Sequence, residues 1–186
     1  MILLFEGPDN VGKSTQIKLL LKYFVDKPTF VIHFSGIPGL SPEASRQYSE
    51  KMYLDMFYLM GESHRNGRNL IFDRSHIGES VYAPIFRNYS GDFIFDIENI
   101  FQSTDVFKHI KLFIFIDDPN ALINREDGNS FSVDLNIKQQ EIDLFKTAYD
   151  KSCIPTKYLI NIHDKSIEEV HTIITDLLFE QTDECN

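Results

Sequence analysis

The feature that most constrains this chain is the eight-residue run at positions 7–14, near its N-terminus. It reads Gly-Pro-Asp-Asn-Val-Gly-Lys-Ser and satisfies the pattern G-x-x-x-x-G-K-[ST] in full. An apolar segment, residues 2–5, precedes the run, and apolar side chains at helical spacing follow from Lys13. A strand, a glycine-rich turn and a helix in this order predict a loop whose backbone N–H groups wrap the phosphates of a nucleotide.

Each part of this loop has an expected role in holding Mg-ATP. The glycines let the backbone turn inward, Lys13 reaches the β- and γ-phosphates, and the Ser14 hydroxyl can ligate Mg²⁺. The residues expected to bind the nucleotide are Gly7, Asn10, Val11, Gly12, Lys13, Ser14 and Thr15. The expected cofactors are therefore ATP and Mg²⁺. The loop alone does not specify a reaction, but the chain lacks the Asn-Lys-x-Asp motif with which GTPases usually read their base.

Short apolar runs alternate with amphipathic segments along the rest of the chain. Strands are expected at residues 2–5, 30–34, 70–72, 110–116 and 157–162, and helices at residues 13–24, 41–64, 78–87, 95–101, 121–125 and 135–149 and after Ser166. Nearly continuous apolar strands between helices predict a parallel sheet covered on both faces. We therefore expect an α/β chain with three layers and a five-stranded parallel sheet flanked by helices. Without repeats or linkers, residues 1–186 are expected to form one domain.

Polar residues follow three of the expected strands, namely Glu6-Gly7, Asp73-Arg74 and Asp117-Asp118. Ligands of open parallel sheets bind beyond the carboxyl ends of the strands. We therefore expect these charged side chains to border the binding site.

Two stretches resemble the thymidylate kinase family. Residues 5–16, FEGPDNVGKSTQ, resemble the signature F-E-G-x-D-x-x-G-K-S-T-Q, and the resemblance implies that Asp9 accepts a hydrogen bond from the acceptor's 3′-hydroxyl. Residues 70–74, LIFDR, are similar to the family's D-R-Y motif, with Ser75 in place of the tyrosine. This match implies a P-loop kinase fold in which Asp73 lies beside Mg²⁺ and Arg74 binds the acceptor phosphate.

Weaker matches implicate further residues. Residues 116–125 resemble the strand and helix that lead into the family's lid, which implies a short lid at about residues 125–135 in which Arg125 stabilises the transferring phosphoryl group. By the same resemblance Tyr82 would lie near the deoxyribose and Phe57 would stack on the base. Arg46 and Arg87 are candidates for holding the acceptor phosphate, and a solvated surface position is the alternative for each. The expected catalytic residues are thus Lys13, Asp73, Arg74 and Arg125.

The sequence leaves the base of the acceptor open. The arginine that reads the base in the family falls at Gly61, so Glu62, Ser63 or His64 are the alternatives, and the chain could accept another deoxynucleotide or several. We expect phosphorylation of a deoxynucleoside monophosphate, with dTMP as the first expectation.

Two other functions stay open beside this one. Asp73-Arg74-Ser75 also resembles the E-R-S motif of deoxynucleoside kinases, whose acceptor is an unphosphorylated nucleoside. A P-loop ATPase without a small acceptor is the other alternative. Glu6 could hold a Mg-bound water or be structural, and the scattered histidines show no metal-ligand spacing.

Charge and composition limit the expected partners. The formal net charge is −10, which disfavours gripping a nucleic acid and favours small nucleotide substrates. No apolar run approaches the roughly 18 residues that a membrane span needs, and no secretory leader is recognisable. Cys153 and Cys185 form no disulfide framework. We therefore expect a cytoplasmic protein without membrane partners and, from the family resemblance, a homodimer.

Overall fold

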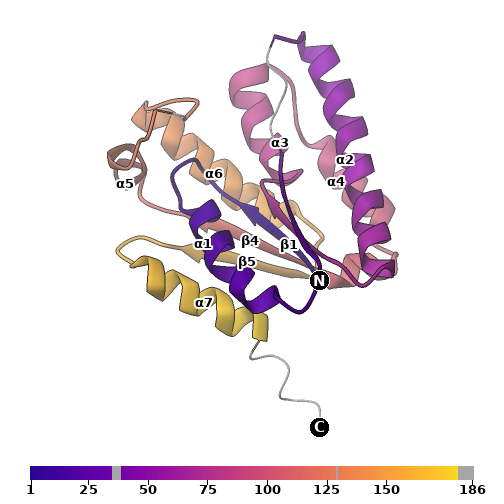
Figure 1. Ribbon diagram of the computed structural model, residues 1–186. Helices are drawn as coiled ribbons and strands as arrows, with labels where there is room; N and C mark the ends of the chain where they lie inside the picture. The colour runs from indigo at the N-terminus through magenta and orange to yellow at the C-terminus, as the bar shows by residue number, and fades with distance from the viewer. Residues whose placement is uncertain (35–38, 129, 180–186) are drawn as a thin grey trace.

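A five-stranded parallel sheet forms the centre of the computed structural model, which describes residues 1–34, 39–128 and 130–179 (Figure 1). The strands are β1 (Ile2–Glu6), β2 (Thr29–His33), β3 (Asn69–Asp73), β4 (Ile110–Ile116) and β5 (Thr156–Asn161). Their order across the sheet is β2-β3-β1-β4-β5, and every neighbouring pair is parallel. This confirms the expected α/β class and the five-stranded parallel sheet.

Helices cover both faces of this sheet, which gives three layers (Figure 1). The helical segments are α1 (Lys13–Leu20), η1 (Leu21–Phe24), α2 (Pro42–Arg65), α3 (Ile77–Tyr82), η2 (Ala83–Arg87), α4 (Phe93–Phe101), η3 (Asp105–His109), α5 (Pro119–Asn124), α6 (Leu135–Lys151) and α7 (Ile167–Phe179). Helices α1 and α7 pack together on one face, whereas α2, α3, α4 and α6 form the layer on the other. No helix of the described residues is long and apolar enough to cross a membrane.

Side-chain caps fix several helix starts where the sequence predicts them. The Ser41 hydroxyl accepts a hydrogen bond from Ala44 N at 3.3 Å, and Pro42 occupies the first turn of α2. The Ser166 hydroxyl accepts from Glu169 N at 3.1 Å just before α7. Both caps confirm the expected helix starts.

How deeply each strand is buried depends on its position in the sheet. Strands β1 and β3 are wholly buried, and Phe5 stacks on Phe113 and Phe115 with ring centroids 5.2 and 5.8 Å apart. The edge strand β2 departs from the expected burial on both faces, because Phe30 and Val31 remain about half exposed. An edge strand has a sheet neighbour on one side only, so its apolar side chains are covered less completely.

The carboxyl ends of β1, β3 and β4 lie at one edge of the sheet, as expected. Glu6, Asp73 and Asp117 are all buried there. Cys153 is exposed and unpaired among the described residues, and Cys185 lies outside them.

Two glycines give a matched test of this packing. A Cβ on Gly91 would lie 2.2 Å from the carbonyl oxygen of Glu79, so the loop that carries Gly91 would have to move away from α3. Overpacking of this kind costs about 1–3 kcal/mol. We expect Gly91→Ala to lower the free energy of unfolding by that amount, measured by chemical denaturation.

Gly61 serves as the control because it lies inside α2, where its nearest atom to a new Cβ is an Arg65 side-chain nitrogen at 3.9 Å. Alanine in a helix interior is better than glycine by about 0.5–1 kcal/mol. Gly61→Ala should therefore stabilise the protein slightly. Equal stability of the two variants would contradict the close packing of Gly91 on α3.

Candidate active site

The loop between β1 and α1 has the backbone geometry that a phosphate-wrapping turn requires. Gly7 has a φ of 135°, and a Cβ there would lie 2.3 Å from the Phe115 carbonyl oxygen, so only glycine fits. Asn10 and Gly12 are also left-handed, with φ of 65° and 84°. Helix α1 begins directly afterwards at Lys13, so its N-terminus points toward the loop.

Lys13 is held inside this loop. Its ammonium donates to the carbonyl oxygens of Gly7 and Pro8 at 2.8 and 2.7 Å. Burial, together with repulsion from the Arg74 guanidinium, lowers the pKa of Lys13 to about 8. Its position between the loop carbonyls leaves it ready to turn toward an anionic ligand.

Ser14 and Asp73 form a second pair of groups below the loop. The Ser14 hydroxyl donates to Asp73 Oδ2 at 2.6 Å, and His33 Nδ1 lies 3.5 Å from the same oxygen. The other oxygen, Asp73 Oδ1, is buried and has no hydrogen-bond partner among the described residues. A hydroxyl beside an unsatisfied carboxylate oxygen fits a hard divalent cation such as Mg²⁺, which prefers oxygen ligands and bound water.

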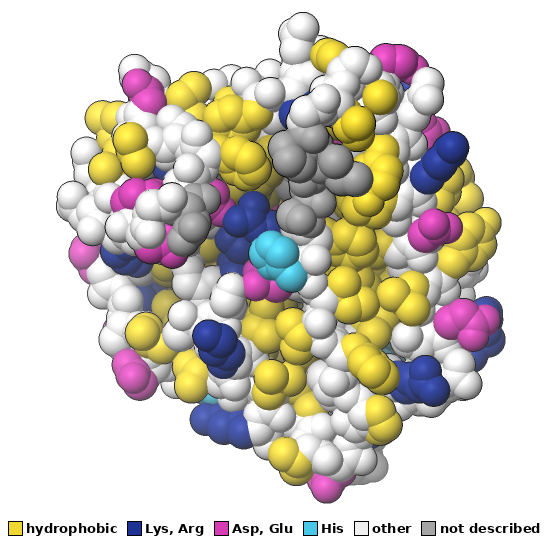
Figure 2. All heavy atoms as spheres, turned by 45° about the horizontal axis from the view of Figure 1, so that its top comes forward, with side chains coloured by type: hydrophobic (Ala, Val, Ile, Leu, Met, Phe, Trp, Pro, Cys, Tyr) yellow, Lys and Arg dark blue, Asp and Glu magenta, His cyan; other side chains and the backbone are white. Residues whose placement is uncertain are grey.

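These groups border a polar cavity of about 350 Å³. It is lined by Asp9, Asn10, Gly12, Lys13, Ser14, Thr15, His33, Asp73, Arg74, Arg125 and Asp127. Figure 2 shows basic, acidic and histidine side chains gathered in a hollow on this face, bordered by hydrophobic side chains. Of the residues expected to bind nucleotide, Gly7 and Val11 support the loop from within, and the other five line the cavity.

Asp9 and Arg74 form an ion pair between the loop and the end of β3. The Arg74 guanidinium contacts Asp9 Oδ1, while Asp9 Oδ2 is buried without a partner among the described residues. Arg74 has a φ of 74°, a rare conformation for a side chain of this size. Because Arg74 also lines a second cavity, it stands at the junction of the two.

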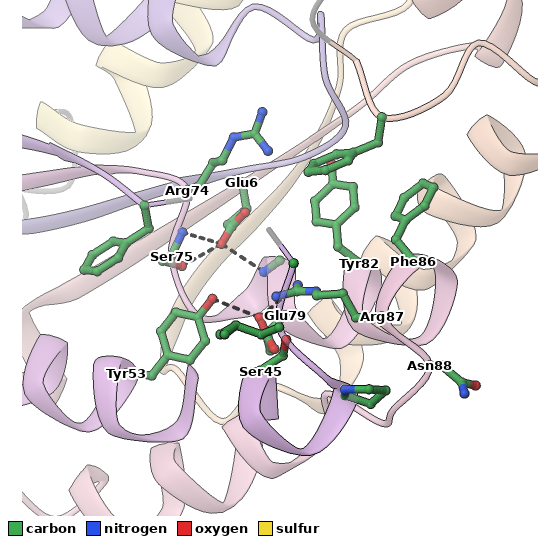
Figure 3. A pocket seen from close by; sticks show the side chains of 16 residues that line it. Glu6, Ser45, Tyr53, Arg74, Ser75, Glu79, Tyr82, Phe86, Arg87 and Asn88 are labelled. Carbon is green, nitrogen blue, oxygen red and sulfur yellow. Dashed lines mark hydrogen bonds and ion pairs between the residues drawn. The ribbon is translucent and has the colours of Figure 1, made fainter. Parts of the chain in front are cut away.

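The second cavity is a larger cleft of about 550 Å³ (Figure 3). Its apolar lining consists of Phe34, Leu40, Pro42, Tyr53, Tyr82, Phe86 and Phe131. Its polar lining includes Glu6, Ser45, Arg74, Ser75, Glu79, Arg87 and Asn88. Aromatic walls with a few polar groups are typical of a site for a small planar ligand.

Tyr82 and Arg87, two of the residues expected to bind the substrate, line this cleft. The Tyr82 hydroxyl is buried without a partner among the described residues, and burial raises its pKa well above the usual range. Tyr82 is therefore a neutral hydroxyl available to a ligand. Arg87 faces Glu79, with 3.0 Å between Arg87 Nη2 and Glu79 Oε2.

Phe57 and Arg46 are not in the cleft, so their expected roles are wrong for this structure. Phe57 is fully buried and stacks on Phe101 with ring centroids 5.0 Å apart, because it lies on the core-facing side of α2. The Arg46 guanidinium lies over the Phe93 ring, and its Nη2 is 3.9 Å from Glu50 Oε2; Arg46 lines neither cavity.

The residues of α2 that the sequence suggested for base recognition do not line either cavity. These are Glu62, Ser63 and His64, beside Gly61. Glu62 instead pairs with Arg65 on the exposed face of the helix at 2.5 Å. The part of α2 that borders the cleft is its beginning, where Pro42, Ser45 and Tyr53 lie.

Described residues of segment 125–135, the expected lid, line both cavities. Asn10 Nδ2 donates to Glu126 Oε2 and Ser130 Oγ, both at 3.0 Å, which joins the loop to this segment. Phe131 stacks on Phe86 with ring centroids 5.2 Å apart, and both residues line the cleft. Arg125 pairs with Asp117 and lines the polar cavity. Asn129 of the expected lid lies outside the described residues.

Two features escaped the sequence reasoning. Glu79, buried in α3 at the cleft, carries no motif signal and can be recognised only once α3 is placed. His64, Asp105 and His109 bring three metal-ligating atoms within 4.8 Å of one another, although His64 is far from the other two in the sequence. His64 lies in the last turn of α2, at the end of the helix opposite the cleft, and Asp105 and His109 lie in η3.

The lowered pKa of Lys13 predicts a pH dependence. A nucleoside triphosphate attracts the charged ammonium, so above pH 8 binding must first return a proton to Lys13. We expect the dissociation constant for ATP, measured by calorimetry, to rise about tenfold per pH unit above pH 8. Lys13→Arg, whose guanidinium stays charged, should show no such rise. A constant affinity of the wild type from pH 7.5 to 9.5 would contradict the assignment.

Comparison with known proteins identifies the fold through solved structures, since neither a protein-family model nor a curated protein sequence matches. Thymidylate kinase from Candida albicans aligns with a TM-score of 0.68 and 17% identity over 97% of this chain and 91% of its own. The YorR protein of Bacillus subtilis, solved with phosphorylated GDP, gives 0.67 and 20% over 97% of both chains. Thymidylate kinase from Ehrlichia chaffeensis gives 0.66 and 18% over 96% and 98%. The chain therefore has a thymidylate kinase-like P-loop kinase fold.

Proposed function

We propose that this chain is a nucleoside monophosphate kinase, which transfers the γ-phosphoryl group of ATP to a nucleotide held in the aromatic cleft. The observation that carries this proposal is that the polar cavity and the cleft meet at Arg74, which lines both. A kinase must bring two anions together with a cation between them. The fold shared with thymidylate kinases supports this reading.

The triphosphate would lie on the loop, with its terminal phosphate at the Arg74 end of the polar cavity. Lys13 would leave the carbonyls of Gly7 and Pro8 for the β- and γ-phosphates. Ser14 and Asp73 would hold Mg²⁺, directly or through its water. The bound ion would offset the negative charge of the phosphates.

The acceptor would enter the cleft with its phosphate toward Arg74. The guanidinium offers a planar fork of donors that matches a phosphate. The unpaired Asp9 Oδ2 can accept a hydrogen bond from a sugar hydroxyl, and the Tyr82 hydroxyl can donate one nearby.

Transfer then needs positioning and charge neutralisation and no covalent intermediate. An oxygen of the acceptor phosphate attacks the γ-phosphorus in line, the bond to the β–γ bridging oxygen breaks, and ADP and a nucleoside diphosphate result. Arg125 would stabilise the transferring group, and the lid residue Phe131 would keep water out of the cleft. dTMP is the acceptor that the family resemblance favours.

An ADP-release assay with a panel of acceptors tests this function. We expect Mg-ATP turnover to rise strongly with one or more of dTMP, dUMP, dCMP, dGMP, dAMP and AMP. Lys13→Ala should abolish the stimulated rate. ADP release that is indifferent to every acceptor would instead identify an ATPase, and near-full activity of Lys13→Ala would refute the loop assignment itself.

Glu6 favours a second candidate, a deoxynucleoside kinase. Its carboxylate borders the cleft and accepts hydrogen bonds at Oε1 from Ser75 N, Ser75 Oγ and Gly78 N, at 2.7, 2.7 and 3.1 Å. Burial raises the pKa of Glu6. A hydroxyl acceptor needs a base to take its proton, whereas the oxygens of a phosphate acceptor are already ionised.

Glu6→Gln separates the two candidates. Loss of a general base lowers the rate by about 10²–10⁴-fold, so thymidine or deoxycytidine phosphorylation should fall by that factor if nucleosides are the substrates. Monophosphate phosphorylation should change by less than about tenfold, because it requires no base. The comparison needs kcat/KM of both variants with matched nucleosides and monophosphates.

A further inference from the structure

The residues that the sequence suggested for recognising the acceptor base do not line the cleft. Gly61 to His64 lie outside the cleft, and Phe57 is in the core. Some other polar group must therefore meet the edge of a bound base. The inference that follows rests on the proposed function, since it concerns the acceptor in the same cleft.

The orientation of the acceptor narrows the search. Its phosphate must face the polar cavity, which meets the cleft at Arg74. The base therefore lies away from Arg74, between the aromatic walls. Figure 3 shows Tyr53, Glu79 and Arg87 grouped on one side of the cleft, with Arg74 on the other.

The Glu79 carboxylate has more hydrogen-bond acceptor sites than it has partners in the structure. Oε2 accepts from the Tyr53 hydroxyl at 3.2 Å and forms an ion pair with Arg87 Nη2 at 3.0 Å, and Oε1 accepts from the Tyr89 hydroxyl. A carboxylate has about four lone-pair sites, so these three partners leave at least one site open. With only 1% of its surface exposed, Glu79 is a buried anion fixed in place by its partners.

Arg87 lies beside Glu79 because of the π-helical turn η2. In a regular α-helix, residue i+8 is rotated by about 80° from residue i. The wider turns of η2, residues 83–87, reduce that rotation and place Arg87 on the same face as Glu79. Asn88, at φ 57°, ends the segment immediately afterwards. The guanidinium has five N–H donors, most of which remain available beyond Glu79.

We propose that Glu79 and Arg87 read the acceptor base and select one with an exocyclic amino group beside an acceptor ring nitrogen, as in cytosine or adenine. Glu79 accepts a hydrogen bond from the amino group, and Arg87 donates to the neighbouring ring nitrogen or carbonyl. A base with a carbonyl at the same position would place its oxygen next to the Glu79 carboxylate. Two acceptors would then face each other, and the open lone pair of Glu79 would stay without a donor. The cleft chemistry thus argues against thymine, which the family resemblance favours.

Pairs of nucleotides that differ only in this group provide the test. dCMP and dUMP differ by an amino group against a carbonyl, and so do dAMP and dIMP. For the wild type we expect kcat/KM and affinity, the latter by calorimetry without ATP, to favour the amino member of at least one pair by about 10- to 100-fold. Glu79→Gln should bring that ratio to within about threefold of unity, because an amide can donate as well as accept.

Glu62→Gln is the matched control, since Glu62 also pairs with an arginine but lies on the exposed face of α2. It should leave the ratio unchanged. A wild-type ratio at or below unity in both pairs overturns the proposal and needs no variant, so poor folding of Glu79→Gln cannot hide a failure. An equal shift in Glu62→Gln also overturns it. If no nucleotide stimulates ADP release, the proposed kinase function fails, whereas the ratio of dissociation constants still decides the base reading.

Discussion

The contact between Arg74 and Asp9 is the interaction on which the rest of the site depends. It joins the phosphate loop after β1 to the end of β3, and it holds the one cation that borders both cavities among the described residues. Arg74 adopts a left-handed backbone to do so. Backbone strain of this kind persists where the surrounding structure fixes it. Here β1, which precedes the phosphate loop, and β3, which precedes Arg74, are both wholly buried.

The site also contains buried carboxylate oxygens that no donor of its described residues satisfies. Asp9 Oδ2 and Asp73 Oδ1 are buried without partners among the described residues. Lys13, meanwhile, donates to loop carbonyls and has a lowered pKa. Unsatisfied buried acceptors cost free energy, so the arrangement is one that a divalent cation and hydrogen-bond donors of a ligand would stabilise.

Much of this architecture could be predicted from the sequence, because it is set by local patterns. Alternating apolar strands and helices define the parallel sheet, and the glycine spacing at residues 7–14 defines the loop. The residues at strand ends, such as Asp73 and Arg74, were placed correctly at the sheet edge for the same reason.

Residues within helices were harder to assign, because their roles depend on rotation about the helix axis. Phe57 and Arg46 lie on α2, as Tyr53 does, but Phe57 is buried in the core and Arg46 lies over the Phe93 ring, whereas Tyr53 lines the cleft. Glu79 and Arg87 meet through a π-helical turn that no sequence pattern indicated.

The central claim is that two nucleotides bind end to end with their phosphates meeting at Arg74. The most direct measurement is the affinity, by calorimetry, of a bisubstrate ligand in which adenosine and a deoxynucleoside are joined by a polyphosphate chain. Joining two site-filling groups raises affinity by about 10²–10⁴-fold without new contacts when the geometry allows both to engage. The account predicts binding at least 100-fold tighter than that of ATP, a factor that Arg74→Ala should remove. Affinity no greater than that of ATP would contradict it.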